Sequence, residues 1–185
     1  MKSVTLDPGK GGFNSGFIYE NLIEKEINLS ITLKCREELM RHGVGVEMTR
    51  ENDSYVGYSQ RIVKANKNHS HAFVSIQCNL GGGSLCELIY SIEAERGLDL
   101  ATSIGYEIKK IGQSAIKIYN RIGHGNKDYN AVIREGLMDS IIIKCGFLDN
   151  EFDRSLIDDL DKQNKFGTAI ARGILKYFHM EYIEE

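Results

Sequence analysis

Tryptophan is absent from the 185-residue sequence, proline occurs once, and the four cysteines are irregularly spaced. A dense disulfide framework and a zinc ribbon both need cysteines at short, regular spacings, so the cysteines are predicted to be reduced thiols. The longest uncharged run, residues 72–86, includes Gln77, Asn79 and three glycines, whereas a membrane span needs roughly 20 apolar residues. The sequence therefore predicts neither a disulfide-stapled domain nor a membrane span.

The charge balance is close to neutral, with a formal net charge of -3 and 26% charged residues. No overall basic field exists to hold nucleic acid, so nucleic acid is not expected as a partner. Hydrophobic residues make up 42% of a chain without internal repeats or Pro/Ser-rich linkers, which predicts one globular domain over residues 1–185. The first residues enter a strand-like segment directly and leave no room for a signal peptide. The chain as it stands is thus expected in the cytoplasm unless a leader has been removed.

Apolar periodicity predicts strands that alternate with helices. The expected strands are residues 3–6, 44–48, 72–77, 85–92 and 141–146, and the expected helices are 22–42, 58–65, 101–111 and 166–178. This order predicts an α/β fold, a three-layer sandwich with a mostly parallel central sheet flanked by helices. In such sheets the ligand crevice lies beyond the carboxyl ends of the strands. The segments after Leu6, Ile76 and Ile143 should therefore surround one site.

Six sequence blocks stand out along the chain. They are, in chain order, Leu6-Asp7-Pro8-Gly9-Lys10-Gly11-Gly12, Glu24-Lys25-Glu26-Ile27-Asn28-Leu29, Met48-Thr49-Arg50-Glu51-Asn52-Asp53, Arg61-Ile62-Val63-Lys64-Ala65-Asn66, Phe73-Val74-Ser75-Ile76-Gln77-Cys78-Asn79 and Lys144-Cys145-Gly146-Phe147-Leu148-Asp149-Asn150. These blocks resemble motifs of the zinc-dependent N-acetylmuramoyl-L-alanine amidases, which cut peptide from the glycan strands of peptidoglycan. The resemblance extends over residues 4 to about 176. It implies an amidase-like fold and peptidoglycan or a muropeptide as ligand, or a protein partner of cell-wall metabolism.

The resemblance also implies a site of one zinc ion held by two histidines and a glutamate, with a second glutamate as general base. These ligand positions fall on Lys10, Gln77 and Glu24, and the catalytic position falls on Lys144. A cationic lysine offers no free lone pair and repels a divalent ion, and a neutral amide oxygen binds zinc more weakly than imidazole. A protonated Lys144 cannot accept a proton from water. We therefore expect no metal and no bound cofactor, although the family uses zinc.

Two cysteines and three histidines are the other candidate metal ligands. Cys78 and Cys145 each follow a lost functional position, and thiolates bind zinc well. Neighbouring residues on a strand face opposite sides, however, so buried core thiols are the expectation. His69 and His71 precede a strand and should lie at the wrong end of the sheet. His124, between two glycines, is expected on an exposed loop.

The two lysines admit two arrangements. Lys10 can form an ion pair with Glu24 from the position of the metal, or Lys10 and Lys144 can extend into solvent from an abandoned cleft. Substrate contacts that the resemblance implies are Asn79 and Arg134, since arginine can hold a carboxylate with two hydrogen bonds. An exposed salt-bridging role for Arg134 is the alternative. Without tryptophan, stacking on sugar rings would fall to tyrosines such as Tyr55, Tyr58 and Tyr129.

Three functions follow from these residues. The first is a non-catalytic amidase-fold protein that binds muropeptide or a protein partner in cell-wall metabolism. The second is a working peptidoglycan amidase with a divergent site, which would hydrolyse the amide between N-acetylmuramic acid and L-alanine. The third is a cytosolic regulator of wall synthesis or sporulation, suggested by the missing leader and the reduced cysteines.

Overall fold

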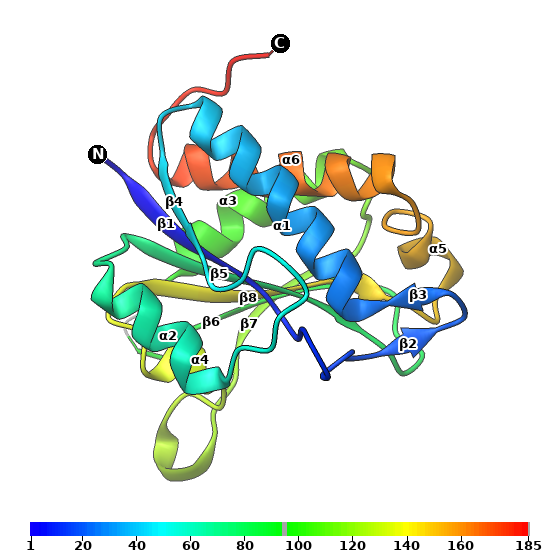
Figure 1. Ribbon diagram of the computed structural model, residues 1–185, viewed down its shortest axis with the longest axis horizontal. Coiled ribbons are helices and arrows are strands. Elements are labelled where there is room, and N and C mark those ends of the chain that lie inside the picture. The colour runs from blue at the N-terminus through cyan, green and yellow to red at the C-terminus, as the bar shows by residue number, and fades with distance from the viewer. Residues whose placement is uncertain (94–95, 185) are drawn as a thin grey trace.

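A six-stranded sheet in the order β4-β1-β5-β8-β6-β7 forms the centre of the computed structural model, which describes residues 1–93 and 96–184 (Figure 1). The strands are β1 (Ser3–Pro8), β2 (Ile18–Tyr19), β3 (Leu22–Ile23), β4 (Gly45–Met48), β5 (Ala72–Asn79), β6 (Cys86–Tyr90), β7 (Ile116–Asn120) and β8 (Asp139–Phe147). The helices are α1 (Glu24–Arg41), α2 (Tyr58–Lys67), α3 (Leu98–Lys110), α4 (Ala131–Arg134), α5 (Glu151–Arg154) and α6 (Leu160–Tyr177), with a short 3-10 turn at His124–Asn126.

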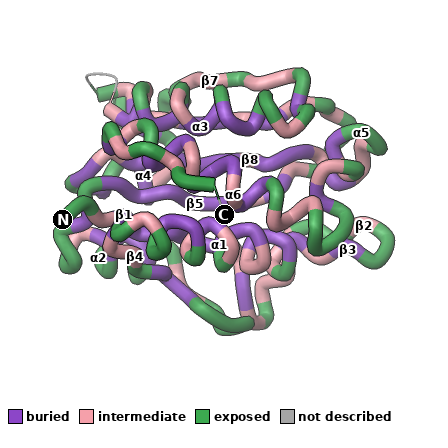
Figure 2. The backbone as a smooth tube through the Cα atoms, turned by 90° about the horizontal axis from the view of Figure 1, so that it is seen from above, coloured by how far each residue is buried: buried purple, intermediate pink, exposed green. Residues whose placement is uncertain are grey.

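Helices cover both faces of this sheet. Side chains alternate between the two faces along each strand, so each face presents its own set of apolar side chains to the helices. One face of the sheet, here called the α1 face, packs against the layer of α1, α3 and α6. Its buried side chains include Val4, Leu6, Val74, Ile76, Ile141 and Ile143. The other face of the sheet, here called the α2 face, packs against α2 and α4. Its buried side chains include Phe73, Ile89 and Ile142. Figure 2 shows the tube buried along most of β5 and β8, the two central strands. The predicted three-layer α/β fold with a mostly parallel sheet is confirmed.

The fold differs from the expectation in three details. β6 pairs antiparallel with β8, while the other four pairings of the sheet are parallel. A loop of six residues, 80–85, joins β5 to β6, which is too short for the crossover that parallel neighbours need. β7 was not predicted, because it lies at the edge of the sheet and none of its residues is fully buried. α1 begins at Glu24 rather than residue 22, since β3 pairs with β2 in a separate hairpin.

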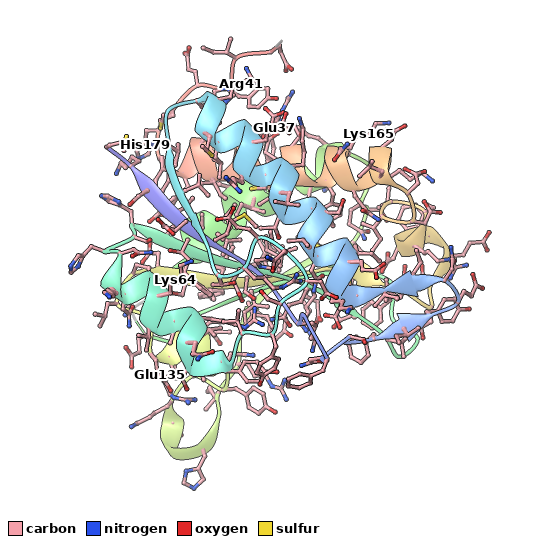
Figure 3. The ribbon with its side chains drawn as sticks, viewed as in Figure 1. Glu37, Arg41, Lys64, Glu135, Lys165 and His179 are labelled. Atoms are coloured by element: carbon pink, nitrogen blue, oxygen red, sulfur yellow. The ribbon has the colours of Figure 1, made fainter. Side chains whose placement is uncertain are left out.

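The C-terminal tail is fastened to the end of α1 by a buried carboxylate. Glu38 accepts hydrogen bonds from Arg41 and from the Tyr182 hydroxyl and forms an ion pair with Lys34. Burial alone would raise the pKa of Glu38, but the hydrogen bonds from these three groups lower it to about 2. Figure 3 shows Arg41 beside the tail, on the opposite side of the sheet from Lys64 of α2. Among the described residues, no helix is long and apolar enough to cross a membrane.

Candidate functional site

A cavity of about 360 Å³ lies on the α2 face, where β1, β5 and β8 end. The segments after Leu6, Ile76 and Ile143 all contribute to its wall, as the sequence predicted. The remaining wall comes from α2, from β6 and β7, and from the segment that leads into α4. The charged side chains that line it are Asp7, Lys10, Arg61, Glu87, Arg121 and Lys144.

Lys10 and Glu24 meet at the edge of this cavity. Glu24 begins α1, is fully buried, and accepts backbone N–H groups at both oxygens, from Phe17 at 2.9 Å and from Cys78 at 3.1 Å. The ammonium of Lys10 lies 3.9 Å from Oε2 of Glu24. Lys10 holds a left-handed backbone conformation with a φ of 65°, and Arg61 fixes it by donating to its carbonyl oxygen at 2.8 Å. The predicted ion pair between Lys10 and Glu24 is therefore confirmed.

Gln77 and Lys144 lie side by side on β5 and β8, at the same position in the parallel register. Nζ of Lys144 donates to Oε1 of Gln77 at 2.6 Å, and Nε2 of Gln77 donates to the Ser75 hydroxyl at 3.1 Å. Burial lowers the pKa of Lys144; Glu24 acts in the opposite direction and Lys10 adds to the lowering. The ammonium of Lys144 is thus hydrogen-bonded to a neutral amide.

A second polar network supports the glycine-containing loop after β1. Asp7 is almost fully buried and accepts hydrogen bonds from Thr49 at 2.6 Å, Ser75 at 2.7 Å and Arg61 at 2.6 Å. Arg50 donates to the carbonyl oxygens of residues 8 and 9. Sequence reasoning gave Asp7 and the two arginines no role, although all three stand inside the motif blocks. Their hydrogen bonds tie the segment that carries Lys10 to α2, to β5 and to the residues after β4.

The residues present do not fit a zinc ion. Within residues 1–93 and 96–184, no group of three His, Cys, Asp or Glu side chains gathers in a metal-binding arrangement. Both oxygens of Glu24 accept backbone donors, and the amide oxygen of Gln77 is occupied by Lys144. Two ammonium groups in this wall would oppose a divalent cation. The donor set therefore favours an anion rather than a metal.

The alternative ligands lie away from the cavity. Cys78 and Cys145 are buried beneath the helices of the α1 face, and burial raises the pKa of both thiols well above the usual value. The expectation of buried core thiols is confirmed. His71 binds Ser3 at the amino-terminal ends of β5 and β1, as predicted. His124 lies exposed in a loop.

The two suggested substrate contacts have different surroundings. Asn79 lines the cavity and donates to Oε2 of Glu87 at 2.6 Å. Arg134 is not part of the cavity wall; it donates to the Asp128 carbonyl oxygen at 2.9 Å and pairs with Glu135, which Figure 3 labels. Its substrate contact stays a prediction. Glu87 was missed, although a lone acidic residue inside an apolar strand could have drawn attention to it.

Known proteins share both this sequence pattern and this fold. The N-acetylmuramoyl-L-alanine amidase family matches residues 4–176. The chain belongs to the N-acetylmuramoyl-L-alanine amidase family. Among amidase relatives, the germination-specific N-acetylmuramoyl-L-alanine amidase of Bacillus subtilis is 28% identical over 194 residues, covering 96% of this chain and 80% of the relative.

Solved amidase structures agree with this membership. The amidase AmiC2 of Nostoc punctiforme is 29% identical to this chain, with a TM-score of 0.86. The match covers 96% of this chain and 97% of the AmiC2 chain. The CwlD amidase of Clostridioides difficile, solved in complex with the GerS lipoprotein, is 29% identical with a TM-score of 0.81. The match covers 97% of this chain and 99% of the CwlD chain. The chain thus shares the amidase fold over nearly all of its length, and two lysines line its cavity.

Proposed function

We propose that this chain is a non-catalytic member of the amidase family that binds a muropeptide in its cavity. The observation that carries the proposal is the ion pair between Lys10 and Glu24, which joins two of the family's ligand positions. The ammonium of Lys10 neutralises the one remaining ligand carboxylate. The residues at the positions of the second histidine and of the catalytic glutamate, Gln77 and Lys144, bind each other.

The chemistry of hydrolysis needs groups that this wall lacks. Water must lose a proton to a general base before or while it attacks the amide carbonyl, and a cationic Lys144 cannot take that proton. One observation favours the alternative, an active amidase with a divergent site: burial lowers the pKa of Lys144, and a neutral amine is a base. This alternative still has no metal-binding group in the described part of the chain, so cationic side chains such as Lys10 would have to polarise the carbonyl. We therefore prefer the non-catalytic function.

A muropeptide suits the remaining wall of the cavity. A volume of about 360 Å³ falls within the range of roughly 300–1,000 Å³ common for ligand sites. Four tyrosines, Tyr55, Tyr58, Tyr119 and Tyr129, contribute aromatic surface of the kind on which a sugar ring can stack. Asn79 can exchange its bond with Glu87 for one with the ligand.

A protein partner is the second candidate. The CwlD amidase, which is similar to this chain, has been solved in complex with a lipoprotein. This chain exposes a stacked aromatic pair beside the cavity, Phe13 and Tyr55, whose ring centroids lie 4.2 Å apart. Exposed aromatic side chains are common anchors of protein interfaces. A partner that binds there would cover the mouth of the cavity and compete with a muropeptide.

The proposal is tested by reverting the site to the family pattern. Variants Lys10→His, Gln77→His and Lys144→Glu, made singly and together, are assayed for bound zinc and for release of peptide from purified peptidoglycan. We expect no single change to restore either, because each leaves a weak ligand or an opposing ammonium. The triple change rebuilds the ligand set around Glu24 and should bind zinc. A single revertant that binds zinc and cleaves would contradict this.

Binding is measured separately, by sedimenting the unaltered chain with purified peptidoglycan. We expect the chain to appear in the pellet and a soluble muropeptide to release it. A chain that stays in the supernatant at every peptidoglycan concentration would contradict muropeptide binding and leave the protein partner as the better function.

A further inference from the structure

The wall of the cavity carries more positive than negative charge. Four cationic side chains and two carboxylates line it, which gives a formal charge of two positive units. Arg61 and Asp7 form a buried ion pair at 2.6 Å and cancel each other. Including Glu24, which lies behind Lys10, still leaves one positive unit. The remaining charges are three cations, Lys10, Lys144 and Arg121, set against two carboxylates, Glu24 and Glu87.

These three cations have hydrogen-bonding capacity to spare. Lys144 has three N–H donors, and within residues 1–93 and 96–184 its hydrogen bond is with the neutral Gln77. Lys10 lies 3.9 Å from Glu24, which is longer than a hydrogen bond. Arg121 stacks on the Tyr129 ring at 3.7 Å and makes no ion pair within the described part of the chain. An anion that enters the cavity would meet donors without having to break an existing ion pair at Lys144 or Arg121.

The nearby carboxylate, Glu87, offsets only part of the positive charge of this wall. Glu87 stands opposite Lys144 in the antiparallel pairing of β6 and β8. Its oxygen accepts from Asn79 at 2.6 Å instead, and no ion pair of Lys144 occurs among residues 1–93 and 96–184. The amide of Asn79 thus engages Glu87, while the ammonium of Lys144 remains directed to the Gln77 amide. A ligand carboxylate is the group that this arrangement lacks.

We propose that the cavity recognises a free carboxylate, held by the ammonium groups of Lys10 and Lys144 with Arg121 at its side. The inference rests on the proposed function, because it takes the ligand to be a fragment of peptidoglycan. Hydrolysis of the amide between N-acetylmuramic acid and L-alanine adds water, leaves the lactyl group as a carboxylate and releases an amine. This chain would therefore bind the acid that an active amidase produces and discriminate against the uncut, neutral amide.

The experiment titrates the full chain with four ligands and follows binding by NMR chemical-shift changes. N-acetylmuramic acid carries the lactyl carboxylate, and its methylamide is the neutral match. L-alanyl-D-glutamate carries peptide carboxylates without sugar, and N-acetylmuramoyl-L-alanyl-D-isoglutamine is the uncut muropeptide. We expect the acid to bind at least ~10-fold more tightly than its methylamide, because a hydrogen bond between charged groups is the stronger kind.

Variants assign the contacts. Lys10→Gln and Lys144→Gln remove one charge each at similar size, and each should weaken binding of the acid by about 10-fold or more. Lys67→Gln is the matched control, because Lys67 is an exposed lysine outside the cavity; it should leave binding unchanged. Equal losses for acid and methylamide would indicate a lost fold rather than a lost contact and would overturn the assignment.

The remaining outcomes separate the two proposals. If the methylamide and the uncut muropeptide bind as tightly as the acid, and the lysine variants bind normally, carboxylate recognition is overturned while muropeptide binding stands. If the dipeptide binds as tightly as the acid, the lactyl group is the wrong carboxylate and the assignment is overturned. If none of the four ligands binds, both proposals fall.

Discussion

Replacing Lys10 and Glu24 by glutamine, singly and together, measures how far the ammonium stabilises the buried carboxylate. The pair is suited to such a double-mutant cycle because the two side chains lie 3.9 Å apart and glutamine nearly conserves the size of each. Lys10→Gln leaves Glu24 with its two backbone donors but without a cation. Glu24→Gln turns an amide nitrogen toward one of those donors.

The expected magnitudes follow from this geometry. Coulomb's law gives about 4 kcal/mol for two unit charges at 3.9 Å in an effective dielectric constant of about 20. The net effect is smaller, because the Lys10 side chain is 21% exposed and gives up hydration to hold its position. We expect Lys10→Gln to lower the free energy of unfolding by about 1–2 kcal/mol and Glu24→Gln by about 2–4 kcal/mol, since a buried donor then loses its partner.

Urea unfolding, followed by circular dichroism, gives these free energies by linear extrapolation. The free energy of unfolding of the double variant should fall by about 1 kcal/mol less than the sum of the two single decreases. This difference is the coupling energy between the two side chains. Lys67→Gln, in an exposed position, should stay within about 0.5 kcal/mol of the unaltered chain. A Lys10→Gln variant as stable as the unaltered chain, with no coupling, would refute the ion-pair account and return Lys10 to solvent.

Two further changes probe the same fold. Gly16→Ala should lower the free energy of unfolding by at least ~1 kcal/mol more than Gly125→Ala in urea unfolding, because both have a φ near 70° but only at Gly16 would the new Cβ collide with Glu24. Equal losses would show that Glu24 moves freely. Since the pKa of Glu38 is lowered to about 2, its contribution is complete above about pH 4.3 and should be lost as the pH falls through about 2. Glu38→Gln should flatten this acid limb of thermal unfolding curves, and an unchanged limb would contradict its role.

The sequence predicts the centre of the fold better than its edges. β5 and β8 contain short apolar runs, residues 72–74 and 141–143, because helices cover both faces of the sheet there, and such runs stand out in the sequence. β7 lies at the edge of the sheet, where Lys117 and Asn120 are exposed, so its pattern is weak. The direction of β6 depends on the length of the loop before it and on which strand is available as a partner. The apolar pattern of the sequence predicts neither of these.

In the site, too, the residues on the central strands were easier to predict than those on the edge strands. The motif blocks drew attention to Lys10, Gln77 and Lys144, which all line the cavity, and to Glu24, which lies beside Lys10. Glu87 and Arg121 reach the cavity from β6 and from the segment after β7, the strands whose arrangement was not predicted. Partners of this kind are fixed by topology rather than by local sequence. The bond between Asn79 and Glu87 could therefore be found only in three dimensions.

Zinc content and peptidoglycan cleavage, measured together on the unaltered chain, test the non-catalytic function most directly. The chain is purified without chelator and supplied with zinc, and an active member of the amidase family is treated in the same way as a control. We expect well under one zinc per chain and no release of peptide above background, whereas the control binds zinc and cleaves. One zinc per chain together with cleavage by the unaltered protein would contradict the proposal and establish a divergent amidase.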